Sequence, residues 1–158
     1  MRRREEGRVP VVRLAFTRER PSHAPQPIEN PRRAGALAEQ LLAGRDRETF
    51  VVIHLDSQRG LLSAEVVAIG TLNATLVHPR EVFKGALLGN AASIVIAHNH
   101  PSGNPAPSPE DLALTRQLLA AGELLGVPVD DHIIVGDTSA SLRETTSLWA
   151  NAGRGGAP

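Results

Sequence analysis

Two histidines one residue apart, His98 and His100, end the apolar run that begins at residue 92. In an extended strand, side chains two residues apart point to the same side, so both imidazoles could grip one ion. Asp111 lies at the start of a segment with helical spacing and is the natural third ligand. Three protein ligands and a water are the usual arrangement around a catalytic zinc ion. The spacing therefore indicates a metal site built from His98, His100 and Asp111.

The segment around Asp111 also has the composition of an ordinary helix N-terminus. In SPED (108–111), Ser108 suits the N-cap, Pro109 the first helical position and Asp111 the third. On this interpretation, Ser108 and Asp111 only satisfy backbone amides. The two interpretations are compatible, because one carboxylate oxygen could bind a metal while the serine caps the helix. The spacing alone leaves both open.

The composition limits which kinds of site the chain can build. Its 158 residues, 41% apolar and 22% charged, suit one soluble domain. The absence of cysteine excludes thiolate zinc sites, so His, Asp or Glu must hold any metal, and it favours a cytoplasmic location. No apolar run approaches the roughly 20 residues of a membrane span. The N-terminal arginines have no apolar segment behind them, so we expect neither a secretory signal nor a membrane contact.

The net charge is zero but unevenly distributed. Residues 1–34 hold nine arginines and four glutamates, whereas the remainder holds eight basic and thirteen acidic residues. A basic arm could contact nucleic acid, but its glutamates and the 3% aromatic content of the chain favour a solvated tail. We expect a basic arm at 1–33 with a short strand (9–16) and a proline-rich linker (21–31). A domain at 34–150 and a flexible tail at 151–158 follow.

The hydrophobic pattern predicts strands that alternate with helices. Helices are expected at 34–44, 78–90 and 108–126, and strands at 48–56, 61–72, 92–98, 131–137 and 139–144. The buried face of the third helix is expected to consist of leucines, namely Leu112, Leu118, Leu119 and Leu125. This alternation is typical of an α/β fold whose sheet is covered on both faces.

The spacing His-x-His-x7-Ser-x2-Asp over residues 98–111 resembles the JAMM motif of the JAB/MPN metalloprotease fold. The segments GTLNATLVHPREVF, AHNHPSGNPAPSPEDLALTRQL and DHIIVGD are similar to the RadC branch of that fold, and the resemblance runs from about Val9 to Trp149. It implies a JAB/MPN (cytidine-deaminase-like) fold, a mixed β-sheet flanked by helices. Full-length RadC proteins carry a helix-hairpin-helix DNA-binding domain ahead of this unit. The chain has no room for one, so we expect the short form.

The resemblance also implies roles for individual residues. In the family, zinc is held by two histidines, an aspartate and a water, which implies His98, His100 and Asp111 as ligands of Zn²⁺. The general base of the family is a glutamate at the start of the first core strand, and Glu48 stands at the corresponding position. Ser108 would donate its hydroxyl proton to the developing oxyanion.

Two further residues leave alternatives open. Glu81, in HPREVF, is the rival for the general base, although a first-turn glutamate that interacts with a helix dipole is the favoured interpretation. His132, in DDHII, could be a fourth ligand or could orient a ligand through a hydrogen bond. We favour an ordinary hydrogen-bonded residue at a strand end.

By this resemblance we expect a zinc metallohydrolase, a peptidase or isopeptidase that acts on a protein or peptide substrate. An accessory protein associated with DNA repair or nucleic acid is an alternative, supported by the arginine-rich arm. A catalytically silent scaffold is another, but the joint presence of Glu48, both histidines, Ser108 and Asp111 argues against it. The oligomeric state is open, and a homodimer is one alternative.

Overall fold

The computed structural model describes residues 27–70 and 77–150. Its helices are α1 (Pro31–Leu42), α2 (Pro79–Leu88), α3 (Pro109–Leu125) and the short α4 (Leu142–Thr145), followed by a 3-10 turn, η1 (Leu148–Ala150). Its strands are β1 (Thr49–Leu55), β2 (Leu61–Ile69), β3 (Ser93–Asn99), β4 (Val129–Val135) and β5 (Ser139–Ser141). The strand predicted at 9–16, most of the predicted linker and the predicted tail lie outside the described residues.

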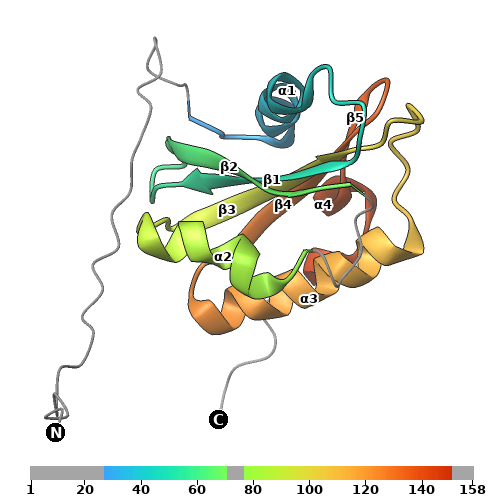
Figure 1. Cartoon of the computed structure of the whole chain (residues 1–158). Coiled ribbons are helices and arrows are strands. Elements are labelled where there is room, and N and C mark those ends of the chain that lie inside the picture. Colours follow the sequence, from blue (N-terminus) through green and yellow to red (C-terminus); the bar gives the residue numbers. More distant parts are fainter. Residues whose placement is uncertain (1–26, 71–76, 151–158) are drawn as a thin grey trace, which may run out of the picture.

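The strands form one mixed sheet in the order β2-β1-β3-β4-β5. Strands β3 and β4 are parallel, and the other neighbouring strands are antiparallel. Helix α1 covers one face of the sheet, and α2 and α3 cover the other (Figure 1). Every residue of β1 and β3 is buried, as expected for strands covered on both sides. The predicted fold class, an α/β mixed sheet flanked by helices, is confirmed.

The alternation of side chains along the central strands divides the core into two layers. The layer against α2 and α3 contains Phe50, Val52, Ile94 and Ile96. The layer against α1 contains Val51, Ile53, Val95 and Ala97. Because strand side chains alternate with a period of two, His98 continues the row of Ile94 and Ile96 and points toward α2 and α3.

The crossover from β3 through α3 to β4 brings the start of α3 back to the end of β3. The loop between them is tied to the end of β4, because His100 N–H donates to Val135 O (2.8 Å) and Asp137 N–H donates to Gly103 O (2.7 Å). Gly103 has a φ of 86°, a left-handed conformation that favours glycine. These contacts, together with the prolines of the loop, fix the approach of α3 to the sheet.

The first helix begins earlier than predicted. It starts at Pro31 rather than at residue 34, because the Asn30 side chain accepts a hydrogen bond from Arg33 N–H and proline suits the first helical position. The predicted linker is also wrong at its end. Ile28 is buried in the core layer of α1, and its N–H donates to Arg59 O (2.9 Å).

Two other predicted elements differ from the structure. The strand expected at 139–144 ends at Ser141, because the Ser141 side chain caps a short helix by accepting from Glu144 N–H. The buried face of α3 consists of Asp111, Leu114, Thr115, Leu118 and Gly122, so of the four predicted leucines only Leu118 is fully buried. Leu125, which was expected in that face, is 43% exposed.

We predict that Gly136→Ala lowers the free energy of unfolding by about 1–3 kcal/mol, because an added methyl group overpacks this site. A Cβ at residue 136 would overlap the Gly103 carbonyl and lie 2.9 Å from Pro105 N, so the loop after β3 must move. Urea unfolding measures the loss, and histidine-selective NMR reports on His100.

The matched control is Gly126→Ala. Gly126 has a φ of 69°, and a Cβ there would meet no atom within 4 Å. Its cost of about 1–2 kcal/mol therefore comes from backbone conformation alone. The His100 resonances should shift in Gly136→Ala and stay in place in Gly126→Ala. Equal resonances in both variants would contradict the role of Gly136 in placing the loop.

Candidate metal centre

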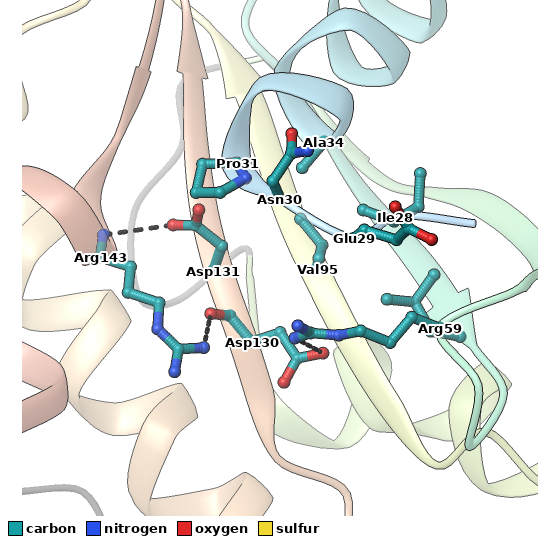
Figure 2. A pocket seen from close by; sticks show the side chains of 11 residues that line it. Ile28, Glu29, Asn30, Pro31, Ala34, Arg59, Val95, Asp130, Asp131 and Arg143 are labelled. Atoms are coloured by element: carbon teal, nitrogen blue, oxygen red, sulfur yellow. Dashed lines mark hydrogen bonds and ion pairs between the residues drawn. The ribbon is translucent and has the colours of Figure 1, made fainter. Parts of the chain in front are cut away.

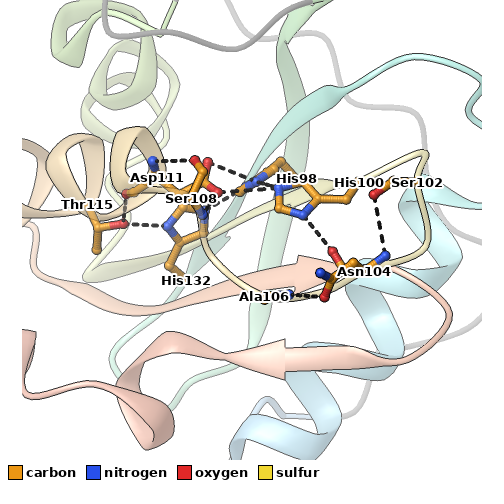
Figure 3. A network of polar contacts seen from close by, with 9 residues as sticks. All are labelled: His98, His100, Ser102, Asn104, Ala106, Ser108, Asp111, Thr115 and His132. Carbon is orange, nitrogen blue, oxygen red and sulfur yellow. Dashed lines mark hydrogen bonds and ion pairs between the residues drawn. The ribbon is translucent and has the colours of Figure 1, made fainter.

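Three side chains from two elements converge at the end of β3 (Figure 3). His98 and His100 face each other through their Nε2 atoms (2.9 Å). The Asp111 carboxylate, from the first turn of α3, lies 3.2 Å from His98 Nε2 through Oδ1 and 3.3 Å from His100 Nε2 through Oδ2. Ligand atoms at 2.0–2.2 Å from one tetrahedral ion lie roughly 3.4 Å apart. The three predicted ligands thus form a cluster that could hold a metal ion.

The cluster lies at the edge of the buried core. The His98 side chain is 1% exposed and that of Asp111 is 9% exposed, whereas that of His100 is 14% exposed and provides the opening to solvent. Phe50 of β1 stacks on His98 with ring centroids 6.2 Å apart and an interplanar angle of 12°. This apolar wall excludes water on one side, which strengthens electrostatic interactions within the cluster.

Asp111 is both a capping residue and a member of the cluster. Its Oδ2 accepts from Ser108 N–H (2.7 Å), and Ser108 Oγ accepts from Asp111 N–H (3.1 Å), which completes a capping box. Its Oδ1 faces His98 instead. The capping interpretation is therefore confirmed, and it is compatible with the metal interpretation, since the helix cap orients the carboxylate toward the cluster.

Asp111 carries a negative charge in this setting. Burial alone would raise the pKa of its carboxyl group. When His98 is protonated, its hydrogen bond and charge, together with the hydrogen bonds from Ser108, outweigh burial and hold the pKa well below its usual range. These interactions favour the ionised form of the Asp111 carboxylate.

In its neutral form, His100 presents a lone pair to that carboxylate. Its Nδ1 lies 2.8 Å from the carbonyl oxygen of Asn104, which can only accept, so Nδ1 carries the proton. The Nε2 atom of a neutral His100 is then an acceptor, 3.3 Å from Asp111 Oδ2. An acceptor and an anionic oxygen at this distance repel each other unless a positive charge lies between them. The donor set therefore fits a cation.

The segment that carries Glu48 is attached to the same strand. Glu48 is partly buried directly before β1, and its carbonyl oxygen accepts from Gly70 N–H (2.8 Å). The Asn99 side chain accepts from Thr49 N–H (2.8 Å) and donates to Arg47 O (3.1 Å). One amide side chain thus holds the backbone on both sides of Glu48.

Glu81 lies elsewhere, in the first turn of α2. Its side chain is 43% exposed and forms ion pairs with Lys84 and Arg80. Hydrogen bonding and charge interaction with Lys84 lower the pKa of its carboxyl group. This environment stabilises the charged form and agrees with a helix-terminus role.

His132 is not the strand-end residue that we favoured. It lies within β4, is fully buried, and places Nε2 2.8 Å from His98 Nδ1. Burial in the first place, and then the charge interaction with His98, lower the pKa of its imidazole well below the usual range. His132 therefore contacts a predicted ligand as a neutral ring.

Thr115 is a member of this network that sequence reasoning missed. Its Oγ1 lies 2.7 Å from His132 Nδ1 and 2.6 Å from Asp111 O. The only signal in the sequence is its place four residues after Asp111, on the same helix face.

A hollow lies on the α1 side of the sheet (Figure 2). It has a volume of about 160 Å³, and an ion pair between Arg59 and Asp130 (2.9 Å) crosses its wall. Burial raises the pKa of Asp131 there, although hydrogen bonds from Ser141 and from the amides of Arg143 and His132 oppose that shift. These contacts anchor α4 to β4, so we assign this hollow a structural role.

Among residues 27–70 and 77–150, no helix is long and apolar enough to cross a bilayer.

Comparison with known proteins agrees with this geometry. The family model described as a RadC-like JAB domain matches residues 28–148. The chain is 48% identical to a UPF0758 protein of Trichormus variabilis over 124 residues, which cover 78% of this chain and 51% of that protein. It is 48% identical to one of Methanosarcina acetivorans (70% and 48% covered) and 45% identical to one of Desulforudis audaxviator (82% and 56% covered).

The chain spans about half the length of these curated relatives. The matched segment includes the whole sheet, helices α1 to α4 and every residue of the cluster. The chain therefore belongs to the RadC family, and residues 28–148 are its RadC-like JAB domain.

Proposed function

We propose that the protein is a zinc-dependent metallohydrolase that cleaves amide bonds, as a peptidase or isopeptidase. The observation that carries this proposal is the convergence of two imidazole Nε2 atoms and one ionised carboxylate within 3.3 Å of one another at the edge of the core. Two nitrogens and one oxygen form a donor set that suits zinc with a position left for water.

Zinc bound there would lower the pKa of a coordinated water to about 7 and polarise the carbonyl of the scissile bond. His98, His100 and Asp111 would hold the ion. They come from a strand end and a capped helix turn, so little reorganisation accompanies binding.

Glu48 would act as the general base and take a proton from the attacking water. The register of β1 and β3 supports this role. Phe50 pairs with His98 and stacks on it, so a residue two positions before Phe50 continues toward His100 on the same face. The contacts of Asn99 restrict the backbone on both sides of Glu48. Glu81, which is ion-paired on α2, lacks this relation to the cluster.

Ser108 would donate a hydrogen bond to the oxyanion that develops on the substrate. Its capping bond uses an oxygen lone pair, since Oγ accepts from Asp111 N–H. The hydroxyl proton therefore remains available for a second interaction. The cap also holds Ser108 beside the carboxylate of Asp111.

A groove beside His100 offers a path for substrate. It has a volume of about 640 Å³, and its walls include Arg45, Asn99, His100 and Asp137. Its charged groups of both signs suit the polar backbone of a peptide. Residues 1–26 of the arginine-rich arm, on which the nucleic-acid alternative depends, lie outside the described residues, so that alternative stays a prediction.

The metal site is tested by elemental analysis of purified protein after saturation with zinc and removal of excess. We expect about one equivalent of zinc per chain. His98→Asn should abolish it, because a ligand is lost. His78→Asn is the matched control, since His78 caps α2 from an exposed position and asparagine also caps helices. A wild-type chain without bound zinc would overturn the metallohydrolase proposal.

The base is tested by Glu48→Gln and Glu81→Gln, each loaded with zinc. The probe is a mixture of unstructured peptides with α-linked and lysine ε-linked bonds, and the products are read by mass spectrometry. Glu48→Gln should lower the rate of hydrolysis by about 10²–10⁴-fold, because glutamine cannot accept the proton. Glu81→Gln should cleave like the wild type. The reverse result would reassign the base to Glu81.

The two roles of Ser108 can be separated by two substitutions. Ser108→Ala removes the cap and should lower the free energy of unfolding by about 1 kcal/mol, whereas Ser108→Asn keeps the cap and should retain stability. Neither variant has the hydroxyl, so both should hydrolyse peptides more slowly than the wild type. Thermal unfolding and the peptide assay give the two readouts. Full hydrolysis by Ser108→Asn would limit Ser108 to capping.

A further inference from the structure

A series of short polar contacts connects His98 to buried residues of β4 and α3 (Figure 3). His98 Nδ1 lies 2.8 Å from His132 Nε2. His132 Nδ1 lies 2.7 Å from Thr115 Oγ1, which lies 2.6 Å from the backbone carbonyl oxygen of Asp111. His98, His132 and Thr115 are at most 1% exposed, so no solvent competes for these contacts.

Thr115 determines which atoms donate and which accept in this series of hydrogen bonds. Two oxygens 2.6 Å apart require a proton between them, and the Asp111 carbonyl has none. The Thr115 hydroxyl therefore donates to Asp111 O and offers only a lone pair to His132. It follows that His132 carries its proton on Nδ1 and donates it to Thr115 Oγ1.

The same accounting then fixes His98. A neutral His132 with its proton on Nδ1 can only accept through Nε2. His98 then donates from Nδ1 to that atom, and the neutral form of His98 has its lone pair on Nε2, directed at His100 and Asp111. This is the tautomer that a metal requires at this position.

We propose that Thr115 and His132 are positioning residues that select the tautomer of His98 in which Nε2 is free to bind a cation. Without this selection, His98 could place its proton on Nε2 and donate it to Asp111 Oδ1, 3.2 Å away. That state would satisfy the carboxylate with a proton and compete with a metal. The hydrogen bonds from His98 through His132 to Thr115, here called the relay, therefore favour the form of the metal-free His98 that can bind a cation.

The relay also joins the three elements that form the site. His98 lies on β3, His132 on β4 and Thr115 on α3, and the last contact ends on the backbone of the ligand Asp111. A single hydroxyl on α3 thus determines the protonation pattern at the end of β3. The consequence for metal affinity rests on the proposed metal site, whereas the tautomer itself does not.

The experiment compares Thr115→Val, which keeps the shape but removes the hydroxyl, with Thr115→Ser, which keeps the hydroxyl. Long-range ¹H–¹⁵N NMR of metal-free, ¹⁵N-histidine-labelled protein at about pH 8, above the usual histidine pKa, reports which ring nitrogen carries the proton. Wild type and Thr115→Ser should show His98 and His132 protonated on Nδ1. Thr115→Val should shift both rings toward Nε2 protonation.

Zinc affinity, measured by competition with a chelator, is the second readout. Thr115→Val should bind zinc about 10–100-fold more weakly than wild type, and Thr115→Ser should be close to wild type, as expected for loss of a hydrogen bond behind a ligand. Unfolding measurements check that both variants are folded. If Thr115→Val does not fold, Thr115→Ala replaces it with the same expected results.

The outcomes separate the two proposals. Unchanged tautomers in the folded variant without a hydroxyl would overturn the relay, whether or not zinc binds. A shift in tautomer with unchanged zinc affinity would overturn its role in metal binding while leaving the metal site itself intact. A wild type that binds no zinc would refute the proposed function, and the tautomers of the metal-free protein would still decide whether the relay exists.

Discussion

The site depends on the closure of the first turn of α3 over the end of β3. His98 and His100 lie at the end of a strand, whereas the Asp111 carboxylate extends from the first turn of a helix. The Asp111 carboxylate meets both requirements of this junction, because one oxygen completes the helix cap and the other faces His98. The loop can close only because Gly103 adopts a positive φ and Gly136 leaves room for its backbone. The same carboxylate therefore both caps the first turn of α3 and completes the cluster.

This junction places charged and polar groups at the edge of the core. The contacts that these groups make explain how the fold accommodates them. The positive end of the α3 dipole and the amide of Ser108 stabilise the charge of Asp111. Behind it, His132 is buried as a neutral ring with partners on both nitrogens. With both rings neutral, repulsion is confined to the four atoms that face one another, the two Nε2 atoms and the two oxygens of the Asp111 carboxylate. A fold that satisfies every outer partner and leaves only the inner acceptors facing one another is suited to a cation.

Much of this could be predicted from the sequence, and the failures have physical causes. The alternating strand pattern placed His98 and His100 on one face, and the SPED segment placed the cap, because both features depend on local spacing. The contacts of Thr115 and His132 could not be predicted, since they depend on the packing of α3 against β4. The leucine face of α3 was assigned from the helical spacing of its leucines, which is right for Leu118. The polar residues Asp111 and Thr115 also occupy the buried face, where they contact His98 and His132. Ile28 was assigned to a linker because prolines surround it, yet it packs in the core.

The period of two along β3 also separates two structural roles at the end of the strand. Residues 98 and 100 point toward α3 and form the cluster, while the residue between them points to the opposite face. That residue, Asn99, uses its amide to hold the backbone at Arg47 and Thr49. A glutamate in an irregular segment before a strand would otherwise lose its position by backbone motion, and loop-borne groups are less well placed than those on strands. Since the end of β3 carries both His98 and the anchor for Glu48, a displacement of β3 would move His98, His100 and Glu48 together and preserve their relation.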